Sequence, residues 1–286
     1  MFLSMRKLFL LFSVFGCAAL WAQQISFNAI APKIGQTFVR TSSYTMDVDV
    51  ILKFAGESLQ EHNDVSTVTV RKAETVLEET GDAITKLKVT YELIERKTVI
   101  TEDKIPENKK AEPSPVLGRT YVVSVQNGII KVTDAYGLKP SSDELDIVKN
   151  DYEGLGKPDS FLQVFRNKSI QPGDRVQMPG VIAEGIFTDA EHRQVKVDNA
   201  TFVLKNVRQN AAIFDTALKM QWNQDANTSV KMNVVGETHV SIQNSRMLSS
   251  NLSGTVRVTG AEQIYDRLVM VDGKGKISIT ETMQLR

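Results

Sequence analysis

Cysteine and histidine are scarce in this chain of 286 residues. The only cysteine is Cys17, and the three histidines, His62, His192 and His239, lie in separate segments. A chain without paired cysteines has neither a disulfide framework nor a multi-cysteine metal site. Histidine is the usual general base and metal ligand, yet no two histidines have the short spacing of a metal motif. The sequence therefore predicts no metal, no cofactor and no disulfide bond.

Sequence motifs for catalysis are also missing. The chain contains no Gly-x-Ser-x-Gly element, which would present a serine nucleophile. Residues 272–275, Asp-Gly-Lys-Gly, match only a fragment of a phosphate-binding loop. We expect these four residues to form a hairpin turn between strands at 265–271 and 276–285. No residue is predicted to be catalytic, and the chain is not expected to be an enzyme.

An excess of basic residues is lacking as well. Without residues 1–22 the chain has 32 basic and 34 acidic residues, a net charge of −2. Nucleic-acid binding depends on basic patches that neutralise phosphates, so this class of partner is not expected. The densest charge run, residues 102–112, mixes both signs and predicts a solvated loop.

Long apolar runs are confined to the first 22 residues. Two basic residues, Arg6 and Lys7, precede an uncharged stretch that ends at Ala22. This order is typical of a secretory signal peptide, and the stretch is too short for a good transmembrane anchor. We expect cleavage after Ala22 and export to the bacterial periplasm or the extracellular space. No transmembrane segment is expected in the mature chain, 23–286.

A second interpretation of the start involves Cys17. The sequence Val14-Phe-Gly-Cys17 loosely resembles the box at which bacterial lipoproteins are cleaved and acylated. In that case the protein would be anchored through Cys17. The bulky Phe15 is unusual for such a box, and simple secretion is preferred.

The clearest structural pattern is the stretch 119–133. Two apolar-rich runs flank Asn127-Gly128, a dipeptide that favours a type I′ turn. With these two residues as the loop, Val123 lies opposite Val132 and one side of the hairpin is apolar. That side needs a cover, and much of the remaining chain shows the same alternation.

Strand patterns fill the segments 25–136 and 174–286. Thr, Val, Tyr and Ile recur with a period of two, as in half-buried antiparallel strands. Segment 71–79 also contains helix-favouring residues, but a strand is preferred because a turn at 80–82 follows it. We expect one β-rich domain, 23–286, which could consist of two similar halves.

The period changes in the segment 140–168, which predicts the helical material of the chain. Ser141 and Glu144 have the spacing of a capping box. A second short helix is expected within 158–166. The apolar side chains of this segment form one candidate face, either a plug for the open side of the sheet or a lid over an apolar ligand: Leu145, Val148, Tyr152, Leu155, Phe161 and Phe165.

These patterns together predict a mainly β fold. We expect a long, curved antiparallel sheet, as a half-barrel or sandwich, with a short central helical insert. The signal peptide, the long strand that follows Gly35-Gln-Thr-Phe38, the hairpin at Asn127 and the closing meander give a layout that resembles exported bacterial β-rich proteins of unknown function. The layout is similar to that of lipoprotein-carrier proteins, in which a curved sheet wraps helices and binds acyl chains.

Three functions are compatible with these patterns, in order of preference. The first is a non-catalytic envelope protein that binds an apolar ligand or a lipidated partner in its curved sheet. The second is a structural or interaction module that holds another envelope protein. A secreted hydrolase ranks last, because nothing singles out a pair of carboxylates.

Overall fold

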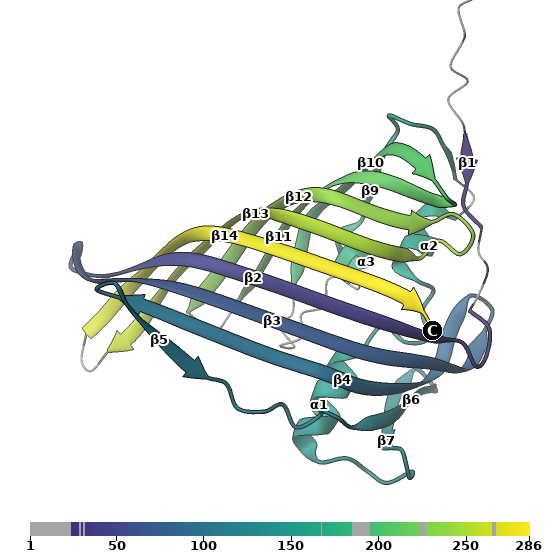
Figure 1. The fold of residues 1–286 in the computed structure, drawn as a ribbon, viewed down its shortest axis with the longest axis horizontal. Helices are drawn as coiled ribbons and strands as arrows, with labels where there is room; N and C mark the ends of the chain where they lie inside the picture. Colours follow the sequence, from purple (N-terminus) through teal and green to yellow (C-terminus); the bar gives the residue numbers. More distant parts are fainter. Residues whose placement is uncertain are drawn as a thin grey trace, which may run out of the picture.

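The computed structural model describes residues 24–28, 30, 32–166, 168–184, 195–223, 227–264 and 267–286. The predicted signal peptide, Cys17 and His192 lie outside these residues, as does most of the segment 183–197, whose sequence predicts one or two strands. Within them the chain is mainly β and forms one large, curved antiparallel sheet with few helices (Figure 1). The predicted fold class is confirmed.

The sheet contains twelve strands and has two ends, at β7 and β9. Strand β5 (Ile105–Lys110) pairs with β4 beside the main path. The other eleven, in spatial order, are β7 (Ile129–Asp134), β6 (Thr120–Gln126), β4 (Ala83–Glu102), β3 (Glu57–Thr80), β2 (Thr37–Phe54), β14 (Arg267–Leu285), β13 (Met247–Ile264), β12 (Thr228–Ser241), β11 (Ala211–Asn223), β10 (Lys196–Arg208) and β9 (Arg175–Met178).

The two expected halves meet at the centre of this sheet, where β2 pairs with β14 along sixteen residue pairs from Met270↔Lys53 to Leu285↔Phe38. Both segments therefore contribute to one continuous sheet. Whether the halves are copies of one unit stays a prediction.

The hairpin at Asn127 and Gly128 is confirmed. These residues have φ angles of 52° and 76°, in the left-handed region that a type I′ turn requires. Val123 lies opposite Val132 as predicted, and both side chains are buried. The strand prediction for residues 71–79 is also confirmed, since they lie within β3.

The predicted turn at residues 272–275 is wrong, because β14 passes through it without interruption. Gly275 lies on the inner face of the sheet, where an added Cβ would overlap the carbonyl oxygen of Asp47. Gly236 and Gly254, on β12 and β13, meet a neighbouring strand in the same way. We call these three residues the glycine crease. Because they have no side chains, the neighbouring strands can approach closely and the sheet can bend at this position.

Two other predictions need correction. The run 102–112, expected to be a loop, contains strand β5, although all six of its residues are exposed. The helical material is not confined to 140–168, because a third helix, α3 (Gly180–Glu184), follows β9. Both elements are short, and their residues show too few periods to separate them from loops.

Helices α1 (Ser142–Asp151) and α2 (Ser160–Phe165) occupy the predicted helical segment. The capping box of α1 is confirmed. The Ser141 hydroxyl accepts from the Glu144 backbone N–H, and a Glu144 carboxylate oxygen accepts from the Ser141 N–H at 2.9 Å. Among the described residues, no helix combines the length and apolar character needed to cross a membrane.

Two separate apolar clusters line the inner face of the sheet. The larger one includes Phe161, Phe202 and Phe214 and packs beneath α2 and α3. The smaller one lies between α1 and strands β4, β6 and β7, and consists of Leu87, Val89, Tyr91, Val116, Tyr121, Val123, Val132, Val148 and Tyr152.

The first described segment is anchored in the larger cluster. Strand β1 (Ile25–Ser26) pairs with β8 (Ser169–Ile170) in a small sheet of its own. The Phe27 ring stacks on Phe165, with 4.6 Å between centroids, and lies 6.3 Å from Phe214. The chain that follows the predicted export signal is therefore part of the core.

Candidate functional site

A row of polar residues crosses the inner face of the sheet near α1 and α2. The strand register aligns Arg40 with Lys72, Ser42 with Glu281, Glu281 with Ser250, and Ser250 with Thr238. Thr216 extends this polar row on β11, because its hydroxyl donates to Thr238 at 2.9 Å. We define the polar row as Lys72, Arg40, Ser42, Glu281, Ser250, Thr238 and Thr216.

Helix α1 adds hydrogen-bonded charges to one end of the polar row. The Lys72 ammonium and the Tyr91 hydroxyl both contact the Asp151 carboxylate, at 3.0 and 2.6 Å. The Tyr152 hydroxyl donates to Glu74 at 2.6 Å. Burial, together with these carboxylates, raises the pKa of Tyr91 and Tyr152 well above the ordinary value, so both phenols stay protonated donors.

Two arginines stand at the middle of the same region. Arg40 Nε is 3.6 Å from Glu281 Oε1, beyond hydrogen-bond distance. The Arg246 guanidinium lies over the Phe38 ring, 4.9 Å from its centroid. Burial raises the pKa of Glu281, against the effect of Arg40, and lowers the pKa of Arg246. These charges are held in a poorly solvated place.

An apolar strip continues from the polar row along β2, β13 and β14. On β14, Ile279 takes the next inner position after Glu281. The strip consists of five side chains that pack against the larger cluster but are only partly buried: Ile279, Met46, Val258, Val271 and Leu52. Ile279 and Val271 are eight positions apart on β14, about 26 Å along an extended strand. Polar and apolar surfaces are thus joined on one concave face.

The six residues of the predicted helical face divide between the two clusters. Leu145, Val148, Tyr152 and Leu155 belong to the smaller cluster, and Phe161 and Phe165 to the larger one. They do not form one continuous surface as expected from the sequence, because α1 and α2 cover different strands. The role of these residues as plug or as ligand face stays a prediction.

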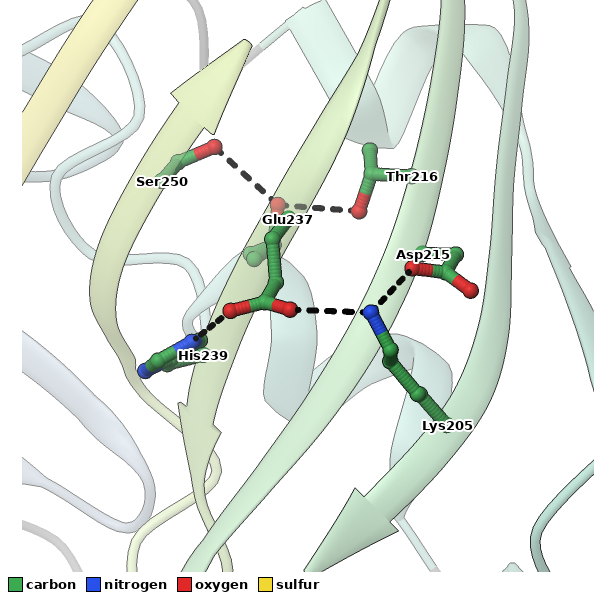
Figure 2. Close-up of polar contacts among 7 residues, drawn as sticks. Lys205, Asp215, Thr216, Glu237, His239 and Ser250 are labelled. Carbon is green, nitrogen blue, oxygen red and sulfur yellow. Dashed lines mark hydrogen bonds and ion pairs between the residues drawn. The ribbon is translucent and has the colours of Figure 1, made fainter.

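The opposite face of β9 to β13 carries a second polar site. A groove of about 930 Å³ is lined by residues of these strands, among them Lys205, Asp215, Val235, Glu237 and His239. Figure 2 shows the Lys205 amine between the carboxylates of Asp215 and Glu237, at 3.4 and 3.3 Å. We call it the outer groove.

The charges of the outer groove compensate one another. Glu237 Oε1 lies 2.7 Å from His239 Nε2, and this hydrogen bond contributes most to the lowered pKa of Glu237. The hydrogen bond to Glu237 and the charge of Asp215 raise the pKa of Lys205. These side chains are well exposed, so the network can hold a polar partner but is screened by water and salt.

The two histidines within the described residues lie at different sites. His62 lies on β3, where its Nε2 is 3.6 Å from Asp64 Oδ1, while His239 belongs to the outer groove. Burial raises the pKa of Asp64, and His62 opposes this shift. Within the described part of the chain, no three residues of the His, Cys, Asp or Glu type converge as metal ligands.

Sequence reasoning missed Arg40, Glu281 and Arg246. Arg40 and Glu281 have the same strand parity as apolar inner residues, which is the available signal in the sequence. A charged residue at an inner position normally marks an outward-facing register or a strand end. Arg246 lies just before β13 and outside any strand, so the strand alternation cannot indicate which face of the sheet its side chain occupies.

No family model and no curated protein matches the chain. Among solved structures it is similar to lipovitellin, in a structure concerned with lipid–protein interactions, at 8% identity and a TM-score of 0.42. That match covers 88% of this chain and 26% of the lipovitellin chain, so the protein spans about a quarter of its length.

Two bacterial structures show weaker likeness. An outer membrane channel from Pseudomonas putida F1 matches at 8% identity and a TM-score of 0.24, over 90% of this chain and 97% of the channel. MucB, in complex with MucA, matches at 10% identity and a TM-score of 0.11, over 85% and 88%. Likeness at this level carries no argument about function.

Proposed function

We propose that the protein is a non-catalytic binding protein of the bacterial envelope, which holds an apolar ligand or the acyl chain of a lipidated partner on its concave face. The observation that carries the proposal is the apolar strip. Five apolar side chains extend the larger cluster across three strands and stay partly uncovered. Contiguous apolar surface that a protein leaves partly open is typical of a binding site.

The dimensions of the apolar strip support an acyl ligand. The strip extends about 26 Å along β14. The hydrocarbon core of a bilayer is about 30 Å thick, so one acyl layer measures about 15 Å. An extended acyl chain therefore fits along the strands. Each buried methylene contributes about 0.8 kcal/mol, which is enough for useful affinity without any charged contact.

The non-catalytic part of the proposal rests on the arrangement of the polar groups. Asp151 and Glu74 each accept a short hydrogen bond from a tyrosine. Such pairs hold α1 on the sheet, and the raised pKa of Tyr91 makes it a poor base near neutral pH. Their chemistry is that of a structural network.

Binding of a fluorescent fatty acid tests the proposal. The protein is purified after export by its own signal, extracted with organic solvent to release bound lipid, and titrated with dansyl-undecanoic acid. We expect saturable fluorescence enhancement with one ligand per chain. The proposal fails if the extract contains no lipid and the titration shows no enhancement.

The outer groove favours a second function, an interaction module for another envelope protein. It combines exposed charges with Val235, whose side chain is 60% exposed. A photo-crosslinking amino acid at Val235 is expected to capture a discrete partner in cells. The matched position is Leu268, 57% exposed on β14 and outside the residues that line the groove. Equal capture at both positions would contradict this function.

A further inference from the structure

We propose that the ligand of the concave face is a long-chain fatty acid whose carboxylate binds Arg40 and Arg246. The inference rests on the proposed function and specifies the chemical class of the ligand. It depends on three observations: the hydrogen-bonding state of Arg40, the environment of Arg246, and the position of both beside the apolar strip.

Arg40 has one buried donor that its neighbours leave without a hydrogen bond. Its Nε is buried and makes no hydrogen bond to any described residue. The carboxylate of Glu281 lies 3.6 Å away, which permits an ionic attraction but no hydrogen bond. A guanidinium presents five N–H donors in a planar fork that matches a carboxylate. An incoming carboxylate would satisfy the donor that is now without a partner.

The Arg246 guanidinium lies over an aromatic ring, and the charge of Asp159 also acts on it. Within the described part of the chain, its guanidinium contacts the Phe38 ring at 4.9 Å. Phe38 precedes Arg40 by two positions on β2, so both residues belong to the inner face. Burial lowers the pKa of Arg246; the charge of Asp159 opposes this shift, and the positive charge of Arg40 adds to it. Two neighbouring cations in a poorly solvated place are stabilised by anions, and Asp159 and Glu74 act on both arginines in this way.

Two nearby acids can become protonated, and thus neutral, when such an anion binds. Burial raises the pKa of both Glu281 and Asp159, so each takes up a proton more readily than an exposed acid. Asp151 is already satisfied by Lys72 and Tyr91. A bound carboxylate can therefore replace part of the negative charge that now faces the arginines.

Geometry connects this charged position to the apolar strip. On β2 the inner positions run from Arg40 through Ser42 and Tyr44 to Met46. On β14 they run from Glu281 to Ile279. A carboxylate at the arginines thus places an attached chain on the apolar strip. A fatty acid matches both parts of the site, because its carboxylate faces the arginines and its unbranched hydrocarbon chain lies on the apolar strip.

The test compares ligands with the same chain and different head groups. Hexadecanoate and 1-hexadecanol are titrated into the delipidated protein by calorimetry. We expect hexadecanoate to bind about tenfold more tightly, as for a charged hydrogen bond. Arg40→Gln and Arg246→Gln should each remove this preference and leave the affinity for 1-hexadecanol unchanged. The unchanged alcohol affinity also shows that the variants are folded.

A matched control and three further outcomes complete the design. Arg257→Gln changes an arginine that pairs with Asp272 outside the polar row, and should not alter either affinity. If both ligands bind the wild type equally, the carboxylate site is refuted and the apolar site stands. If neither binds, the proposed function itself fails. Equally tight binding of palmitoyl-lysophosphatidylglycerol would refute the specific assignment to a fatty acid.

Discussion

The Tyr121 hydroxyl donates to Glu144 Oε1 at 2.9 Å and joins the Asn127 hairpin to the first turn of α1. Arg119, at the start of the same hairpin, contacts this oxygen at 2.8 Å. Glu144 also closes the capping box with Ser141. One carboxylate therefore caps the helix and fixes it to the strands that it covers.

Replacement of this carboxylate should show a characteristic pH dependence. Burial alone would raise the pKa of Glu144, but hydrogen bonds from Ser141 and Tyr121 and the charge of Arg119 lower it below its ordinary value of 4.5. A lowered folded-state pKa means that the stabilisation is present above pH 4.5 and disappears as the pH falls through the folded value. Glu144→Gln should cost about 2 kcal/mol at pH 7 and less at pH 3, in urea unfolding at both pH values. Glu153→Gln, on the exposed side of the same region, should change neither, and an equal loss at both pH values would contradict the assignment.

The glycine crease should tolerate no side chain. Gly275→Ala places a Cβ on the carbonyl oxygen of Asp47, so β14 and β2 must separate. We expect a loss of at least about 3 kcal/mol in the free energy of unfolding, or an insoluble protein. Gly154→Ala is the matched control, because its Cβ would meet no atom within 4 Å. Comparable stability of the two variants would show that the strands can move apart at little cost.

Removal of the Phe27 ring should destabilise the whole domain. Its ring stacks on Phe165, which in turn stacks on Phe214 in the larger cluster. Phe27→Ala should lower the free energy of unfolding by about 3–5 kcal/mol in guanidinium denaturation. Ile30→Ala, at a position 57% exposed, should have no measurable effect. A small effect at Phe27 would mean that the first segment is not part of the cooperative unit.

A hydroxyl on the apolar strip should weaken binding. Val258→Thr keeps the shape of the side chain but adds a polar group that an acyl chain cannot satisfy. The dissociation constant for dansyl-undecanoic acid should rise about fivefold to tenfold. The same substitution at Val235, exposed on the outer groove, should leave it unchanged. Equal effects at both positions would place the ligand elsewhere.

The sequence contained enough information for most of the β structure. Residues alternate clearly where one face of a strand is covered, as in β11, whose inner residues Phe214 and Leu218 are buried and whose outer Asp215 is not. The turn at Asn127 needs two positive φ angles, which few dipeptides allow. These signals are local, so they can be recognised without knowledge of the partner strand.

The errors and omissions have a non-local cause. Gly273 and Gly275 suggest a turn until the neighbouring strand is known, because only the approach of β2 explains the missing side chains. Arg40 and Glu281 lie 241 positions apart in the chain, and their proximity depends on the pairing of β2 with β14. The candidate site combines such distant residues, and no short motif could reveal it.

The pairing of Phe38 with Leu285 has a consequence for biosynthesis. The centre of the sheet joins β2 to the distant β14, so this pairing can form only after β14 has been synthesised. Closing so long a loop is entropically costly and slow, and a sheet rich in distant contacts forms slowly. The edge of β2 that faces β14 thus stays unpaired during synthesis until β14 emerges, and its free backbone groups are a template for other chains in that interval.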